Sequence, residues 1–357
     1  MLNYLGEALK DSLKNRKSSE YLNFIVLVLL SIFFSKNLSF IKTKGIVIIL
    51  LISYSIELMK NFWTWRNLQI AWELEGHDVD APLATLLIHG FGASKNHWRH
   101  NQSKLATLAP SYSIDLVGFG ESSKPKAQLL YEKEDPKSFH YCFDEWSEQI
   151  LDFCDSIVQK PVLLVGNSIG GVIALKASEK LSKKCLAVVL IDCAQRTMDD
   201  KRLSEQSLLM RLLRPVIKTI VRQRFLSSQL FKNAANPSFI EKILRIAYPS
   251  GNNVNEELID ILFRPTQSEG ASEAFRGFIN LFDDYLAPDL LKNLEQKVHL
   301  CWGEKDPWEP VGEAKKWFEN FECIESLEII PDAGHCPHDE MPEKVNPIIE
   351  KIIQDAI

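Results

Sequence analysis

The sequence lacks an excess of positive charge. Its 357 residues carry 41 Lys and Arg against 47 Asp and Glu, a formal net charge of −6. Proteins that bind nucleic acids usually carry the opposite balance, so no nucleic-acid partner is predicted. The chain also lacks internal repeats and clusters of His, Cys, Asp and Glu at metal-ligand spacing. Neither a repeat fold nor a metal site is therefore expected.

Cysteine is scarce and shows no pairing pattern. Seven cysteines occur, an odd number, and no two of them are spaced as C-x-x-C. This pattern argues against a small secreted domain held together by disulfides. We predict reduced, mostly buried thiols in a compartment that resembles the cytoplasm. A chain of this length can bury enough apolar surface to fold without cross-links.

Long hydrophobic runs are restricted to the N-terminal region, where two of them cover residues 21–34 and 46–59. Each is shorter than the roughly 20 residues needed to cross a bilayer upright. Flanking residues extend both runs, and the nearby Trp63 and Trp65 suit a membrane interface. We predict that residues 1–65 form a membrane-associated segment, with a hairpin as the favoured form. Whether the runs span the membrane or lie on it stays open.

Two other interpretations of this segment compete. A signal peptide would use Lys14, Arg16 and Lys17 as its basic region, but no A-x-A-like cleavage site follows the first run. A pair of buried core helices is the third interpretation. Basic residues are slightly more frequent at the two ends of the segment than between the runs. The positive-inside rule then places both ends, and the rest of the chain, on the cytoplasmic side of a membrane.

From residue 66 onward the pattern changes to short apolar runs that alternate with helix-like segments. This alternation is typical of βαβ units, so we predict an α/β fold with a mostly parallel sheet and helices on both faces. The predicted core comprises residues 66–193 and 294–357. The predicted strands are residues 69–74, 85–88, 112–116, 161–165, 186–191, 298–302 and 327–330.

Residues 194–293 carry no motif and interrupt the core, and we predict that they form a helical cap. One stretch of this region places apolar residues at helical spacing and basic residues largely on another face. The apolar residues are Leu209, Leu212, Leu213, Val216, Ile217, Ile220 and Val221, and the basic ones are Arg211, Arg214, Lys218 and Arg222. Such a helix can lie on an anionic membrane surface. It can also pack on the core with a solvated basic face, and both interpretations stay open.

The strongest motif is GNSIGG at residues 166–171, which matches G-x-S-x-G. It follows a predicted strand directly and precedes a helical run, as a nucleophile elbow requires. In such a turn Gly166 and Gly170 keep side chains out of a crowded corner, and the amides at the helix start favour negative charge. We predict that Ser168 is a catalytic nucleophile. A glycine-rich turn without chemistry is the alternative.

A serine hydroxyl is a poor nucleophile unless a base takes its proton. His335, which follows the last predicted strand, is the predicted base, and His338 is its competitor. An acid must hold the tautomer of the base. Asp306 lies just past a strand and gives the chain order Ser, Asp, His that this motif implies. Asp192, at the end of an earlier strand, stays the alternative acid.

The tetrahedral intermediate of such a reaction needs two hydrogen-bond donors for its oxyanion. The predicted donors are the backbone amides of Ile169, next to the nucleophile, and of Phe91, in the HGFG loop after strand 85–88. Because only the backbone acts, the Phe91 ring is free to shape the pocket. We predict a structural hydrogen-bonding role for His89 in the same loop.

With these residues in place, the chain from about residue 65 to the end resembles the α/β-hydrolase superfamily. The motifs HGFGAS, DLVGFGESSKP, GNSIGG, WGEKDPWEP and DAGHCPHDE occur in the expected order. Within it, the chain looks most like the chlorophyll dephytylase and pheophytinase group of photosynthetic cells. The resemblance implies a cofactor-free serine hydrolase that cleaves a carboxylic ester, with a lipophilic substrate such as a chlorophyll-type phytyl ester. Contact with membrane lipid, on the cytoplasmic or plastid stromal side, is predicted separately from the N-terminal apolar runs and their flanking basic residues.

Other functions stay open. Carbon–carbon bond hydrolases and cofactor-free peroxidases of this fold use the same triad, and a ligand-binding protein can keep the scaffold without activity. Dehalogenases and epoxide hydrolases of this fold use a carboxylate nucleophile, so Ser168 argues against both. The sequence indicates neither the exact substrate nor the oligomeric state.

Overall fold

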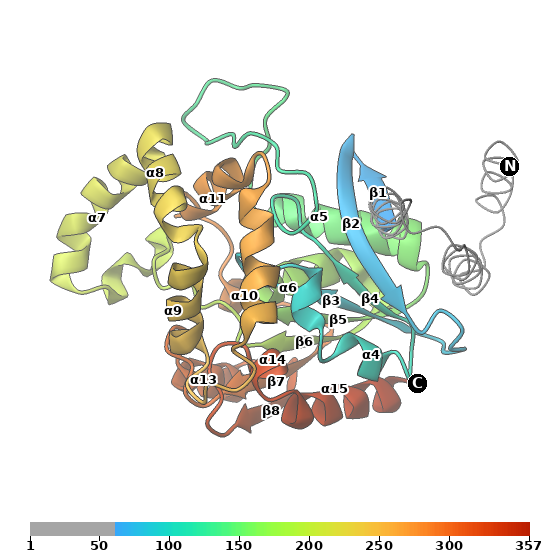
Figure 1. Cartoon of the computed structure of the whole chain (residues 1–357). Coiled ribbons are helices and arrows are strands. Elements are labelled where there is room, and N and C mark those ends of the chain that lie inside the picture. Colours follow the sequence, from blue (N-terminus) through green and yellow to red (C-terminus); the bar gives the residue numbers. More distant parts are fainter. Residues whose placement is uncertain (1–60) are drawn as a thin grey trace, which may run out of the picture. The chain divides into compact units, whose positions relative to one another are not determined.

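The computed structural model describes residues 61–357, so the predicted apolar runs 21–34 and 46–59 lie outside the described residues. The described part is built on an eight-stranded sheet with the strand order β1-β2-β4-β3-β5-β6-β7-β8 (Figure 1). The pairings β1–β2 and β2–β4 are antiparallel, and the others are parallel. The strands are β1 (Asn61–Trp65), β2 (Leu68–Glu75), β3 (Ala84–Ile88), β4 (Ser111–Ile114), β5 (Val162–Asn167), β6 (Cys185–Ile191), β7 (Lys297–Gly303) and β8 (Ile324–Ile330).

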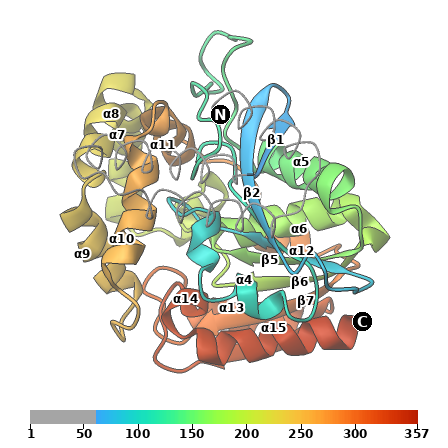
Figure 2. The same cartoon turned by 45° about the vertical axis from the view of Figure 1, so that its right-hand side comes forward.

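The predicted α/β architecture is confirmed, because the sheet is mostly parallel and helices cover both of its faces (Figure 2). Successive side chains of a strand point to opposite faces. Val162 and Leu164 of β5 accordingly pack in one apolar core, which α5 and α6 share, whereas Leu163 and Val165 pack in a second core with α15. The core helices are α4 (Gln102–Leu105), α5 (Phe143–Phe153), α6 (Ile169–Leu181), α12 (Ala287–Leu291), α13 (Val311–Asn320), α14 (Pro337–Glu340) and α15 (Pro342–Ala356).

The seven predicted strands are present, but strand β1 was not among them. The assignment of Trp63 and Trp65 to a membrane interface is wrong, because both belong to this strand. Trp65 is buried, and its indole N–H donates to a carboxylate oxygen of Asp152 at 2.7 Å. Arg66 and Asn67 both have positive φ, which is typical of the two-residue type I′ turn that joins β1 to β2. The core therefore begins at residue 61 rather than 66.

Replacing Trp65 with alanine is expected to destabilise the core by about 3–5 kcal/mol, because a large buried side chain and its hydrogen bond are lost. Phe62 lies on the same strand with its side chain exposed. Phe62→Ala is therefore the matched control, with an expected effect within about 0.5 kcal/mol. Urea unfolding of the two variants measures the difference. Equal stabilities would mean that β1 is not part of the folded core.

Most of the chain between β6 and β7 forms the cap, which both views show on one side of the sheet (Figures 1 and 2). Its helices are α7 (Leu208–Arg222), α8 (Arg224–Ala234), α9 (Pro237–Ala247), α10 (Glu256–Phe263) and α11 (Ala271–Ile279). The predicted cap boundary at residue 293 differs from the structure, since Ala287, Leu290 and Leu291 of α12 lie in the main core. That short helix packs against α6, so the cap ends before it. Within residues 61–357, no helix combines the length and apolar character needed to cross a bilayer.

Candidate active site

Four strand ends carry the predicted site residues. The segments after β3, β5, β7 and β8 contain Phe91, Ser168, Asp306 and His335, respectively. In the sheet β3 is the neighbour of β5, and β7 is the neighbour of β8. The carboxyl ends of parallel strands share one edge of a sheet, where ligands of such folds bind. Phe91, Ser168 and His335 accordingly line one pocket, and Asp306 lies directly behind His335.

Ser168 stands at the sharp turn between β5 and α6. Its backbone has φ 55° and ψ −121°, a strained conformation of the kind that projects a nucleophile above the sheet. A Cβ at Gly166 would lie 2.3 Å from the carbonyl oxygen of Gly170, and a Cβ at Gly170 would lie 2.3 Å from that of Ile88. The turn therefore has no room for side chains at either glycine, for the reason that the motif suggested.

His335 and Asp306 are in direct contact. Nδ1 of His335 lies 2.7 Å from Oδ2 of Asp306. The other carboxylate oxygen accepts the amides of Trp308 at 2.8 Å and Glu309 at 3.0 Å, which fixes its orientation. Burial alone raises the pKa of Asp306, but the hydrogen bond to His335 and the charge of that ring bring it below its ordinary value. An ionised Asp306 holds the imidazole proton on Nδ1 and leaves Nε2 as the acceptor.

Asp192, the alternative acid, lies on the far side of Asp306. Its carboxyl group hydrogen-bonds the amide of Gly303, at 3.0 and 3.2 Å, and the side chain of Asp306. Burial and the negative charge of Asp306 raise the pKa of Asp192 well above its usual range. Both effects favour the protonated form of Asp192, which can donate to Asp306. Ligand atoms of Asp192, Asp306 and His335 lie within 4.8 Å of one another, and this chain of hydrogen bonds accounts for their spacing without an ion.

His338, the competing base, is in the wrong place for that role. It is fully buried against the rings of Trp98 and His97, whose centroids lie 4.4 and 4.8 Å away. Burial lowers the pKa of His338 well below its usual range. Its side chain packs beneath the pocket and is not part of the pocket wall, to which His97 belongs.

The two predicted oxyanion donors, Phe91 and Ile169, both line the pocket. In the part of the chain that the structure describes, neither amide N–H has a hydrogen-bond acceptor. The loop that carries Phe91 is pinned by His89, whose Nδ1 donates to the carbonyl of Gly90 at 2.7 Å and whose Nε2 accepts the amide of Leu116 at 3.1 Å. Burial lowers the pKa of His89 to about 4. Its ring is therefore neutral and acts as a structural hydrogen-bonding group.

The site opens into a pocket of about 570 Å³, a volume in the range of small-molecule sites. Its wall is mostly aliphatic and aromatic, and much of it comes from cap helices α8, α9 and α11. The ring of Phe91 stacks on Phe278 of the cap with centroids 3.8 Å apart. The main apolar cap residues of the wall are Phe231, Phe239, Ile240, Ile243, Leu244, Phe275 and Phe278.

Three residues near the site were not predicted from the sequence, although each adjoins a motif residue. The ring of Trp308 packs edge-on against His335 at 4.9 Å. Asn167 donates from its side chain to the carbonyl of His335 at 3.1 Å and so ties the serine turn to the histidine loop. Glu309 accepts the amide of Gln195 at 2.8 Å, and burial raises the pKa of Glu309 to about 7.

Comparison with known proteins gives the family. Residues 85–348 match the model described as the alpha/beta hydrolase family. The chain belongs to the alpha/beta hydrolase family. The resemblance to this superfamily that the motifs indicate is thereby confirmed.

Three relatives illustrate the likeness. The chloroplastic pheophytinase of Arabidopsis thaliana is 25% identical over 315 residues, covering 79% of this chain and 63% of that protein. The chain thus spans less than two thirds of the length of that relative. An esterase from Thermogutta terrifontis has a TM-score of 0.62 at 21% identity, covering 84% of this chain and 99% of that one. A bacterial membrane phospholipase A has a TM-score of 0.62 at 22% identity, covering 95% and 99%. The two solved structures establish the fold alone.

Proposed function

We propose that this α/β hydrolase cleaves carboxylic esters through an acyl-enzyme, with Ser168 as nucleophile, His335 as base and Asp306 as acid. The observation that carries the proposal is the 2.7 Å contact between His335 and Asp306, in a pocket that a strained serine shares. Acyl transfer needs a serine at the start of a helix and a base close to it, and a carboxylate must orient that base.

The proposed reaction has two halves. Ser168 Oγ attacks the ester carbonyl carbon while Nε2 of His335 takes its proton, and the amides of Phe91 and Ile169 stabilise the oxyanion. The tetrahedral intermediate collapses, the bond to the alcohol oxygen breaks, and His335 returns the proton to the leaving alcohol. A water molecule then repeats the sequence on the acyl-enzyme and releases the acid and Ser168. Asp306 stays ionised throughout and stabilises the imidazolium.

We infer a lipophilic substrate from the wall of the pocket, which is mostly apolar although it also includes the Arg196–Asp199 ion pair and Thr266. Apolar side chains recognise apolar surface without direction, so they favour a long hydrocarbon group over a small polar ester. The similarity to a pheophytinase adds a chlorophyll-type phytyl ester as a specific candidate. For the whole protein we therefore propose lipophilic carboxylic esters as the substrate class.

A fluorophosphonate probe and a panel of esters test the proposed function. We expect the probe to label Ser168, and we expect turnover to rise from short p-nitrophenyl esters to long-chain and phytyl esters. Labelling together with turnover of a carbon–carbon bond substrate, but not of esters, would favour the other reaction class of this fold. Absence of both labelling and turnover would favour a ligand-binding protein.

We further propose that residues 1–60 hold the enzyme on a membrane, with the catalytic domain on the cytoplasmic or plastid stromal side. The support is the pair of apolar runs in the sequence and the basic residues at their outer ends. Every proposed catalytic group lies in residues 61–357, which contain a complete sheet with helices on both faces. Removal of residues 1–60 should therefore abolish anchoring without removing any proposed catalytic group.

A chain that begins at Asn61 is expected to hydrolyse water-soluble esters at an unchanged rate. Its turnover of an ester dissolved in vesicles should fall by about tenfold or more, because anchoring raises the local concentration of such a substrate. The two substrates are compared for the full and shortened chains with vesicles present. Equal losses on both substrates would contradict the proposal, since residues 1–60 would then be needed for the fold.

A further inference from the structure

Helix α7 of the cap presents its apolar side outward. A surface helix usually turns its apolar stripe to the core and its charged face to water. In α7, Arg214 is buried and Lys218 is partly buried, and both donate to the carboxylate of Asp200. Lys218 also lies over the ring of Phe282, 4.8 Å from its centroid. The interpretation that this helix packs on the core with a solvated basic face is therefore wrong.

The opposite side of α7 is a continuous apolar stripe, which we call the docking face. Its side chains recur at helical spacing and are exposed to solvent. The exposed fraction of the residue is 72% for Leu208, 68% for Leu212 and 56% for Val216. Single exposed apolar residues are ordinary, but a whole helix face of them marks an interaction site. The docking face consists of Leu208, Leu209, Leu212, Leu213, Val216 and Ile220.

The charged side chains of α7 and α8 themselves are all basic. Residues 208–240 contain six Lys and Arg and no Asp or Glu, although the whole chain has a net charge of −6. Three of the six pair with acidic residues from outside this stretch. At 3.6 residues per turn, Arg211 and Arg222 fall along one edge of the apolar stripe. Both are exposed. An apolar face edged by basic side chains matches the layering of an anionic bilayer, with headgroups above acyl chains.

The neighbouring helices connect the docking face with the substrate pocket. Helix α8 exposes Phe225 and Leu230, whereas its Phe231 lines the pocket. Helix α9 likewise exposes Ile246, and its Ile240 lines the pocket. Helix α8 contacts both α7 and α9. A bilayer at the docking face would therefore lie close to the helices that line the pocket.

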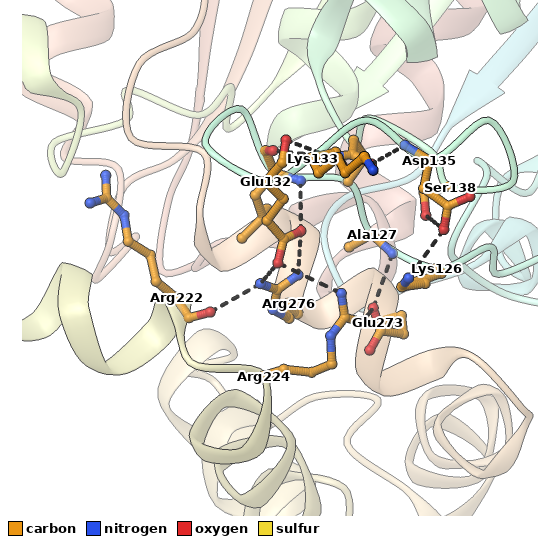
Figure 3. A network of polar contacts seen from close by, with 12 residues as sticks. Lys126, Ala127, Glu132, Lys133, Asp135, Ser138, Arg222, Arg224, Glu273 and Arg276 are labelled. Carbon is orange, nitrogen blue, oxygen red and sulfur yellow. Dashed lines mark hydrogen bonds and ion pairs between the residues drawn. The ribbon is translucent and has the colours of Figure 1, made fainter.

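The base of this surface is held by a polar network between the cap and the core (Figure 3). Arg276 of α11 donates to Glu132 at 2.7 Å and to the carbonyl of Arg222, the last residue of α7, at 3.0 Å. Arg224 pairs with Glu273, which also accepts the amide of Ala127 from the core at 3.0 Å. Figure 1 shows α7 at the outer edge of the cap, away from the sheet. The helix is thus presented on a fixed support.

We propose that the docking face of α7 inserts into the interface of an anionic lipid bilayer. Two other occupants fit the charges less well. A second copy docked face to face would bring two basic stretches together. Residues 1–60 contain eight Lys and Arg against four Asp and Glu, so they too would repel the basic edge of α7. Anionic lipid complements both the apolar stripe and its basic border.

Hydrogen–deuterium exchange of the full chain tests this, because it reports on α7 itself even when residues 1–60 bind the same vesicle. With vesicles of phosphatidylcholine and phosphatidylglycerol, exchange over residues 208–222 should slow by about tenfold, the effect of burying one leucine. Vesicles of phosphatidylcholine alone should slow it less, and added salt should reduce the difference. In the double variant Leu212→Glu, Val216→Glu, vesicles should no longer slow exchange over residues 208–222.

The control is Phe318→Glu, a charge placed on an exposed aromatic residue of α13, outside the cap. In this variant anionic vesicles should slow exchange over residues 208–222 as much as in the unaltered chain. No slowing of α7 on either vesicle would overturn the proposal. Protection without lipid that grows with protein concentration would assign the face to a second copy, and protection without lipid at all concentrations would assign it to residues 1–60. The readout involves no turnover, so soluble-ester activity of the same variants tests the proposed function separately.

Discussion

Replacing Ser168 with alanine is expected to reduce turnover by about 10⁵-fold, as removal of a triad nucleophile does in other hydrolases. The alternative route, direct attack of water on the ester, keeps only the oxyanion donors and the pocket. Stability should change little, because one hydroxyl group is lost at a position where the backbone conformation is held by its neighbours. Single-turnover assays with the best ester of the panel, together with thermal unfolding, measure both effects.

Ser178→Ala is the matched control for this variant. Ser178 lies on the same helix, is fully buried, and donates its hydroxyl to the carbonyl of Leu175 at 2.8 Å. The chemical change is identical, but this hydroxyl is not part of the pocket wall. Turnover should therefore stay within about twofold, with at most a loss of about 1 kcal/mol in stability. If the Ser168 variant kept more than a small fraction of the activity, another group would have to be the nucleophile.

The parallel strands could be predicted from sequence because each contains a short, largely apolar run between helix-like segments. Strand β1 was missed for a physical reason. Its tryptophans continue an apolar N-terminal run, and aromatic residues suit both a membrane interface and a half-buried strand. Its turn uses Arg66 and Asn67 at positive φ rather than the Asn-Gly or Asp-Gly pair that marks such hairpins. Only the pairing with β2 distinguishes the two interpretations.

The orientation of α7 could not be predicted for a different reason. Helical periodicity shows that Leu212 and Arg214 lie on different faces, but it does not show which face meets the protein. That choice depends on Asp200 and Phe282, which lie outside the helix and become partners of the basic face only after folding. An ion pair that buries a basic side chain can thus reverse an assignment that rests on hydrophobicity alone.

The candidate site also has features that could be predicted from the sequence and others that could not. Motif order alone led to the pair of Asp306 and His335, because each follows a strand that ends at the same edge of the sheet. The state of Asp192 depends on burial and on the distance to a second carboxylate, neither of which a sequence displays. The same holds for the pocket wall, since Phe231 and Phe278 lie on separate cap helices and carry no motif.

Asp306→Asn is expected to reduce turnover by about 10⁴-fold, whereas Asp192→Asn should cost less than about tenfold. An amide at position 306 can keep the hydrogen bonds from Trp308 and Glu309 on its oxygen. Its NH₂ group then faces Nδ1 of His335, which must become the acceptor. The imidazole proton moves to Nε2, so the ring can no longer take the proton of Ser168.

The contrast with Asp192 follows from its raised pKa, which favours the protonated form. An amide at position 192 still donates toward Asp306 and still accepts the amide of Gly303, as the protonated carboxyl group does. The change from Asp to Asn therefore preserves the hydrogen bonds at position 192. At position 306 it places a donor where the carboxylate accepts the Nδ1 proton of His335. Steady-state kinetics of both variants on a soluble ester, with thermal unfolding to confirm that each is folded, gives the ranking. The opposite ranking would make Asp192 the acid and reduce Asp306 to a support.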